Sequence, residues 1–224
     1  MLRRFADVIQ WALVVGLTVA VVTVIASRGP RAADEVIPVP VDRLLLKDVS
    51  LEGSPNARVA LLVFSDFECP YCGVFARDVL PILRKEYVET GKVVLGFRHL
   101  PLEAIHPAAV PAAVAAECAG MQGKFWQMHD WLFAQQATLR SLNLKDPELI
   151  GGLDTQKFRQ CSEEPPLTRL RSDAAAAKAL GITSTPAFFL GTVEPTKGGF
   201  TVTRTLAGAW PADTYRGTLN QLLK

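Results

Sequence analysis

The chain has 224 residues, enough for one domain with an insertion or for two small domains. Hydrophobic residues make up 49% of it, so the composition is that of a globular protein with a sizeable core. Arg3, Arg4 and Asp7 are the only charged residues before residue 28, which leaves 22 basic and 21 acidic residues in the rest of the chain. This near-neutral balance argues against nucleic acid as a partner.

An uncharged, apolar run occupies residues 8–26. At about 1.5 Å per residue, a helix of this length spans roughly 28 Å, close to the thickness of a bilayer core. Arg3 and Arg4 precede the run, so the N-terminus is expected in the cytoplasm and the rest of the chain outside. Residues 1–27 are therefore predicted to be a transmembrane anchor. The alternative is a signal peptide cleaved after Ala26, and both place the body in an oxidising compartment.

The first half of the body is predicted from turn residues and periodicity. Prolines and glycines disfavour long regular structure over 28–57, which is predicted to be a stalk and lead-in, with Leu44-Leu45-Leu46 expected to dock on the body. Residues 58–103 follow a β-α-β pattern, which predicts a parallel pair of strands. Its elements are a strand near 59–64, a helix from Cys69 with a bend at Pro81, and a strand over 92–98.

The second half is predicted to consist of a helical insert over 104–180 and a return to strands over 181–224. In the insert, Asp146 and Asp154 are expected to begin helices, because Asp is a favoured N-cap residue. The other expected elements are helices over 108–119, 125–133 and 167–180, strands over 187–190 and 200–206 with a turn at 197–199, and a last helix over 212–224. The order is β-α-β, insert, β-β-α, which without the insert is the thioredoxin order.

Cys69-Pro70-Tyr71-Cys72 carries the chemistry. Cys69 lies between an apolar strand and a helix, where unpaired backbone N–H groups and the helix dipole favour a thiolate. Cys69 is predicted to be the exposed nucleophile and Cys72, one turn on, the more buried resolving thiol. The intervening Pro70 and Tyr71 affect the redox poise without deciding its direction. The alternatives are a structural disulfide or half of a zinc site, and zinc would need a second pair of ligands at suitable spacing.

In combination with other motifs, this stretch resembles the membrane-attached or exported branch of the DsbA-like thiol:disulfide oxidoreductases in the thioredoxin superfamily. The resemblance covers roughly residues 50–224. It is carried by Phe64–Cys72, Arg98–Leu102, Ile105–Pro107, Gln122–Trp126, His129-Asp130, Leu132-Phe133 and Gly181–Phe189. It implies an α/β thioredoxin fold with an inserted helical domain, here preceded by the predicted transmembrane helix.

The resemblance also implies a role for Thr185-Pro186, since in this superfamily the matching proline is cis and lies against the two cysteines. The backbone of Thr185 would then receive an extended substrate by strand addition. The chain departs from the pattern of this superfamily at one position. Many thioredoxins have a buried acid six residues before the first active cysteine, and this chain has Val63 there. Asp66 and Glu68 lie nearer and are expected to be solvated loop charges, with tuning of Cys69 as the alternative.

The remaining cysteines and the histidines are given structural roles. Cys118 and Cys161 are expected to form a second disulfide that joins two helices of the insert, because the chain is predicted to be exported. Two buried free cysteines are the alternative. No metal site is predicted, because no spacing pairs the histidines convincingly. These are His99, His106 and His129, and the last is expected to pack in an aromatic stripe.

The predicted function is oxidation of exported proteins through the Cys69–Cys72 disulfide and a mixed-disulfide intermediate. The predicted partners are exported cysteine-containing proteins and a quinone-linked reoxidising protein of DsbB-like or VKOR-like type in the bacterial inner membrane. The chain is expected to be monomeric and to need no cofactor beyond its redox-active disulfide. The alternatives are a membrane-tethered reductase or isomerase, and a non-catalytic peptide-binding module that uses the thioredoxin groove.

Overall fold

A computed structural model describes residues 43–194 and 198–224 of the chain. The predicted anchor over 1–27 and part of the predicted turn at 197–199 lie outside the described residues. Within those residues, no helix has the length and apolar character needed to cross a bilayer.

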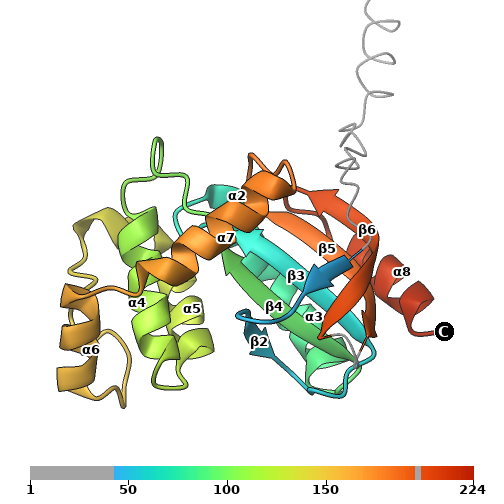
Figure 1. Ribbon diagram of the computed structural model, residues 1–224, viewed down its shortest axis with the longest axis horizontal. Coiled ribbons are helices and arrows are strands. Elements are labelled where there is room, and N and C mark those ends of the chain that lie inside the picture. Colours follow the sequence, from blue (N-terminus) through green and yellow to red (C-terminus); the bar gives the residue numbers. More distant parts are fainter. Residues whose placement is uncertain (1–42, 195–197) are drawn as a thin grey trace, which may run out of the picture. The chain divides into compact units, whose positions relative to one another are not determined.

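A six-stranded sheet forms the centre of the structure, with the strand order β1-β6-β5-β3-β4-β2 (Figure 1). β3 and β4 are parallel, and every other neighbouring pair is antiparallel. The parallel pair is joined by helical segments, which confirms the predicted β-α-β unit. The strands are β1 (Arg43–Leu45), β2 (Ser50–Glu52), β3 (Val59–Ser65), β4 (Val93–His99), β5 (Ala187–Glu194) and β6 (Gly199–Ala207).

Both sheet edges come from the segment that was predicted to be a stalk. β1 pairs with β6 and β2 pairs with β4, each over three residues. Residues 43–52 therefore belong to the folded body, beyond the docking expected for Leu44-Leu45-Leu46. The misjudgement has a physical cause: three-residue strands are too short for their periodicity to be recognised.

β3 is buried on both faces, because its alternate side chains enter two separate cores. Val59, Leu61 and Val63 belong to one core. Ala60, Leu62 and Phe64 belong to the other. A strand covered on both faces has a continuous apolar run instead of alternation, as residues 59–64 do here.

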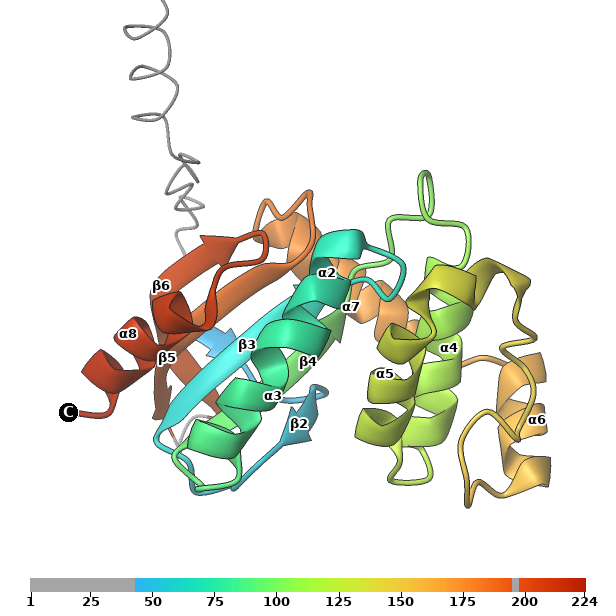
Figure 2. The same ribbon diagram turned by 180° about the vertical axis from the view of Figure 1, so that it is seen from behind.

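Helices cover both faces of the sheet. α2 (Pro70–Val74), α3 (Leu80–Leu83) and α8 (Ala212–Leu222) lie on the face seen in Figure 2, and α7 (Leu167–Ala179) lies on the opposite face. Two wider π-helical turns, η1 (Phe75–Val79) and η2 (Arg84–Val88), make the run after Cys69 irregular. One of them ends just before Leu80-Pro81, in keeping with the irregularity expected where Pro81 cannot donate a backbone hydrogen bond.

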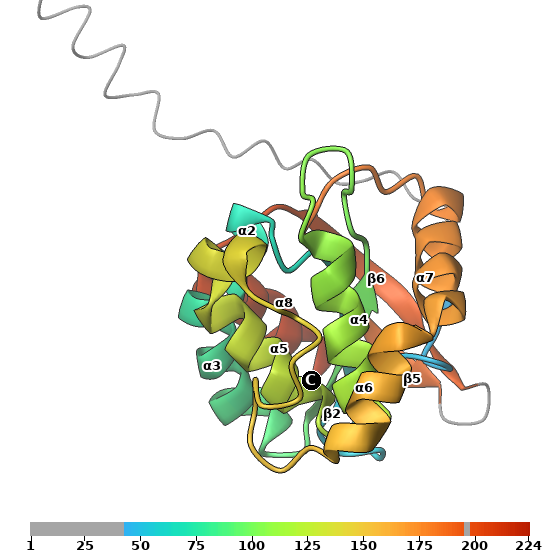
Figure 3. The ribbon, with the colours of Figure 1, turned by 90° about the vertical axis from the view of Figure 1, so that its left-hand side faces the viewer.

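The insert contributes α4 (Ala109–Gly120), α5 (Phe125–Ala134), the 3-10 helix η3 (Gln136–Ser141) and α6 (Thr155–Glu163) (Figure 3). Asp154 caps α6 as predicted, since its carboxylate accepts a 3.0 Å hydrogen bond from the Lys157 backbone N–H. The prediction that Asp146 begins a helix is wrong. Its carboxylate instead accepts from the Glu148 N–H at 2.9 Å within a turn, because the same side-chain chemistry serves turns and helix caps.

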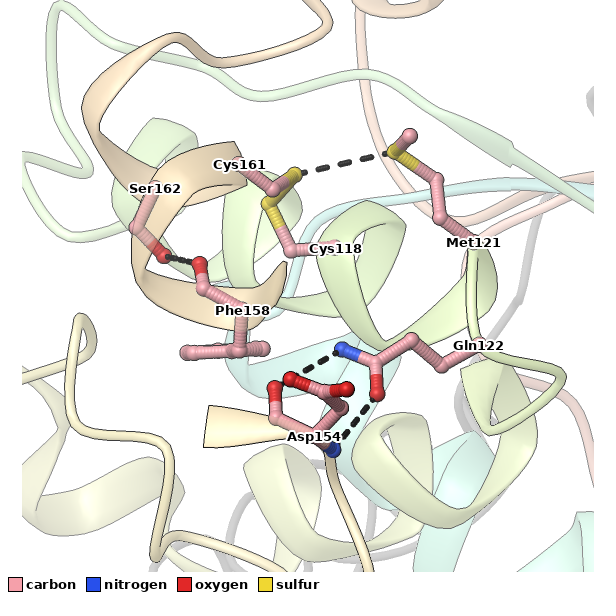
Figure 4. Close-up of a disulfide and its surroundings, with 7 residues drawn as sticks. All are labelled: Cys118, Met121, Gln122, Asp154, Phe158, Cys161 and Ser162. Carbon is pink, nitrogen blue, oxygen red and sulfur yellow. Dashed lines mark hydrogen bonds between the residues drawn. A yellow bond between two sulfur atoms is a disulfide. The ribbon is translucent and has the colours of Figure 1, made fainter. Parts of the chain in front are cut away.

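A disulfide joins Cys118 of α4 to Cys161 of α6 (Figure 4). Their Cα atoms are 5.7 Å apart, within the usual range for a disulfide. Met121 lies beside the bond, with its sulfur 3.7 Å from Cys161 Sγ. The same two helices are tied a second time by the Gln122 side chain, which accepts a 2.7 Å hydrogen bond from the Asp154 N–H. The alternative of two buried free cysteines does not apply to this structure.

Replacing Cys118 and Cys161 together by alanine is expected to lower the free energy of unfolding. The bond spans a sequence separation of 43 residues, and closing such a loop contributes about 4 kcal/mol in the chain-entropy model. Urea unfolding of the oxidised chain and of the double variant measures the difference. Equal midpoints and slopes would contradict the expectation, as would two alkylatable thiols at these positions in the unreduced, unfolded chain.

Candidate active site

Cys69 lies where β3 gives way to α2. It is the N-cap residue of α2, with an extended backbone, and Pro70 takes the first helical position. Proline suits this position because its fixed φ matches the helix and its missing N–H would have had no helical partner. Cys72 lies one turn further on. Neither sulfur is bonded, so the structure shows the reduced dithiol.

The environment of Cys69 favours its thiolate. Its pKa is lowered to about 5, chiefly by a hydrogen bond from the Cys72 thiol. Burial acts in the opposite direction, and hydrogen bonding from Thr185 and from the backbone N–H groups of Cys72 and Tyr71 adds to the stabilisation. The local reason is the one expected from sequence: at a helix N-terminus, N–H groups without helical partners point at the sulfur.

Cys72 has the opposite character. Burial raises its pKa well above the ordinary value, and the neighbouring Cys69 raises it further. Only 1% of Cys72 is exposed, and its sulfur accepts a hydrogen bond from the Asp66 N–H at 3.5 Å. The pair therefore consists of one sulfur that ionises readily and one that keeps its proton. Cys69 is also largely buried, at 4% exposed, which is less accessible than the sequence suggested.

The loop between α7 and β5 completes the site. The Thr185–Pro186 peptide bond is cis, and the Thr185 carbonyl oxygen is 3.3 Å from Cys69 Sγ. The buried Thr185 hydroxyl has no hydrogen-bond partner of regular geometry among the described residues. It is therefore available to the sulfur when Cys69 is ionised. Two segments more than a hundred residues apart thus meet at one atom.

The expectation that Asp66 and Glu68 are solvated is wrong, because both are buried. The Asp66 carboxylate accepts from the Leu102 N–H at 2.9 Å and lies 2.7 Å from His106 Nδ1. The Glu68 carboxylate accepts from the Ala108 N–H at 2.6 Å and pairs with Arg140. Both acids therefore fasten the cysteine loop to the following segments of the chain. Sequence gave no signal for these contacts, since their partners lie 36 to 72 residues away.

His99 and His129 lie in an aromatic cluster, where the His129 ring is 5.8 Å from Phe67 and 4.9 Å from Phe133. Burial lowers the pKa of His129, which keeps its ring neutral near pH 7. Within residues 43–194 and 198–224, no group of three or more His, Cys, Asp or Glu side chains is placed to hold a metal ion.

The sequence and the fold place this chain among known proteins. The thioredoxin family model matches residues 47–196. α-DsbA1 of Wolbachia pipientis is 25% identical, with a TM-score of 0.66 over 80% of this chain and 93% of that one. DsbA2 of Pseudomonas aeruginosa is 30% identical, with a TM-score of 0.59 over 77% of this chain and 93% of that one. The chain belongs to the DsbA-like branch of the thioredoxin superfamily.

DsbA-like sequence also occurs within much longer chains. The Na(+)/H(+) antiporter NhaA 3 of Salinispora tropica is 37% identical over 166 residues, which cover 74% of this chain and 24% of the antiporter. The present chain thus spans about a quarter of the length of the curated relatives it matches. The name "Na(+)/H(+) antiporter" refers to the whole of that longer protein, of which the matched part is about a quarter.

The reactivity of Cys69 is expected to follow its lowered pKa. Below about pH 5 the thiol should be protonated and alkylate slowly, and above it the rate should reach a plateau that extends through neutral pH. The iodoacetamide rate and the ultraviolet absorbance of the thiolate, each measured against pH on the reduced chain, test this. A single transition near the ordinary thiol value would contradict the assignment. A Cys69→Ser variant serves as the control for signal from Cys72.

Replacing Thr185 by valine is expected to raise the pKa of Cys69 by about one to two units, because a hydrogen bond to a charged group contributes about 1.5–3 kcal/mol. Valine keeps the shape of the side chain and removes only the hydroxyl. Thr185→Ser retains the hydroxyl and should leave the pKa near that of the parent chain. If the valine and serine variants titrate alike, the hydroxyl does not stabilise the thiolate.

Proposed function

We propose that this chain is a thiol:disulfide oxidase that transfers the Cys69–Cys72 disulfide to exported proteins. The observation that carries the proposal is the lowered pKa of Cys69. Because the ordinary thiol pKa is near 9, the shift stabilises the reduced, folded form at neutral pH, and this stabilisation is lost as the pH falls through about 5. A stabilised reduced form is what makes a dithiol pair a strong oxidant.

The proposed reaction begins when a substrate thiolate attacks Cys69 Sγ in the oxidised protein. A substrate–Cys69 bond forms, the Cys69–Cys72 bond breaks, and Cys72 leaves and takes up a proton. A second substrate thiolate then attacks the substrate sulfur of the mixed disulfide and releases Cys69 as a thiolate. The substrate has lost two electrons and gained a disulfide, and the dithiol of this chain has gained the two electrons. The lowered pKa of Cys69 assists the second step, since a thiolate of low pKa is a good leaving group.

The surface around Cys69 suits an extended polypeptide substrate. The Thr185 backbone lies beside the sulfur, where it can pair with a substrate strand. Tyr71 is 66% exposed and Val74 is 40% exposed, so apolar side chains flank the dithiol. Exposed apolar residues of this kind favour the binding of unfolded polypeptides, because such chains expose apolar residues of their own.

The cellular setting completes the proposal. The predicted anchor over 1–27 would tether the domain to the bacterial inner membrane and place it on the extracytoplasmic side. There it would meet newly exported proteins and a quinone-linked reoxidising partner of DsbB-like or VKOR-like type. We propose a monomer that uses its redox-active disulfide without another cofactor.

The equilibrium reduction potential of Cys69–Cys72 tests the direction. Titration of the full-length chain against glutathione is expected to give a value near −120 mV, at the oxidising end of the thioredoxin-fold scale. A value near −270 mV would exclude the oxidase and favour a membrane-tethered reductase.

A trapping experiment supplies the control for the assigned roles. Cys72→Ser should form a stable mixed disulfide with a single-cysteine peptide supplied as its disulfide with 5-thio-2-nitrobenzoate, because the Cys69 thiolate attacks the peptide sulfur and nitrothiobenzoate leaves. Cys69→Ser should form none.

A further inference from the structure

The amide of Gln136 bridges the helical insert to the loop that carries the active-site cysteine. Gln136 is the first residue of η3. Its Nε2 donates to the carbonyl oxygen of Phe67 at 2.8 Å and to that of Cys69 at 2.9 Å. Both N–H groups of the amide are thus committed to the two residues that flank Glu68.

The amide oxygen is fixed as well. It accepts a 3.1 Å hydrogen bond from Arg77 Nη1, and the same nitrogen donates to the Phe133 carbonyl oxygen at 3.2 Å. A flipped amide would face the guanidinium with its donors and the two carbonyls with its oxygen, so the network permits only one orientation. Ring packing joins the same two segments, since Phe67 and Phe133 are 5.0 Å apart.

Gly73 leaves the room that Gln136 occupies. A Cβ atom at residue 73 would lie 2.0 Å from Gln136 Oε1, closer than any real contact. The backbone N–H of Gly73 donates to the Cys69 carbonyl oxygen at 3.1 Å. The Cys69 carbonyl therefore receives one hydrogen bond from its own helix and one from the insert, and the absence of a side chain at 73 is what lets both reach it.

We propose that Gln136 is a positioning residue, which holds the Phe67–Cys69 loop so that the backbone N–H groups of Tyr71 and Cys72 face the Cys69 sulfur. The inference rests on the proposed role of Cys69 as the nucleophile. The physical basis is that the carbonyl of Cys69 belongs to the same peptide unit as the N of Pro70, the first residue of α2. Fixing that peptide unit fixes the direction in which the helix N-terminus points, and through it the strength of the hydrogen bonds to the thiolate.

Gln136→Met tests the proposal, because methionine has a similar length and no N–H donors. The thiolate of Cys69 should become about tenfold less favourable, which raises its pKa by about one unit and lowers the reduction potential by about 30 mV. Gln135→Met is the matched control. The Gln135 side chain makes no hydrogen bond within the described part of the chain, and this variant should keep the parent pKa and potential.

A purely structural role would give a different result. In that case Gln136→Met would lower the unfolding midpoint and leave the pKa and the potential unchanged, which would overturn the proposal. Should the methionine variant fail to fold, Gln136→Leu carries the same test. Leucine also lacks N–H donors and places no charge beside the Cys69 loop, so the pKa of Cys69 should again rise.

A double-mutant cycle with Gly73→Ala examines the close approach itself. In the parent chain this substitution should displace the Gln136 amide and raise the pKa of Cys69. In a Gln136→Ala background it should change the pKa little, because the amide is gone and only the end of the flexible Arg77 side chain, whose Nη1 would lie 2.7 Å from the new Cβ atom, has to shift. Equal effects in both backgrounds would overturn the proposal. The reduction potential of the parent chain tests the oxidase proposal, whereas the double-mutant cycle tests the role of Gln136 through differences in pKa between variants. Either proposal can therefore fail while the other holds.

Discussion

A thiolate held at a largely buried position is the constraint on which the site depends. Burial disfavours the charged sulfur of Cys69, so hydrogen-bond donors must more than compensate for the lost water. The donors come from the Cys72 thiol, the Thr185 side chain and the first turn of α2. These donors meet at the sulfur because α2 begins at Pro70, next to Cys69, and because the loop between α7 and β5 brings Thr185 beside Cys69.

The site is therefore assembled from three parts of the chain that are distant in sequence, namely the Cys69 turn, the helical insert and the Thr185 loop. Buried charged groups hold these parts together. Asp173 of α7 is fully buried, and its carboxylate accepts from Arg98 at 2.6 Å and from the His99 N–H at 2.9 Å. His99 in turn lies 2.8 Å from Glu117 of the insert. A buried carboxylate persists only where charged partners and hydrogen bonds replace its water. The strand β4 thus anchors both the insert and the helix that leads into the Thr185 loop.

The parts of this structure that could be predicted from sequence are those with local causes. The continuous apolar run at 59–64 indicated a strand, and Cys69 at a strand-to-helix turn indicated a stabilised thiolate. The short edge strands were missed because three residues carry no usable period. Asp66 and Glu68 were misjudged because an acidic residue in a loop is usually solvated, and the N–H groups that make burial tolerable come from other segments. Gln136 gave no signal for the same reason.

Because Val63 stands where many thioredoxins have a buried acid, that position supplies no carboxylate that could exchange a proton with Cys72. Val63 and Cys72 lie in the same apolar core, and the two nearby acids are committed to fixed partners. Cys72 therefore keeps its proton through the neutral range, in agreement with its raised pKa. A group that does not titrate contributes no pH-dependent term to the stability of the reduced form. Within the dithiol, Cys69 alone supplies the pH-dependent part of that stability, and the hydrogen-bond donors around its sulfur set the size of that part.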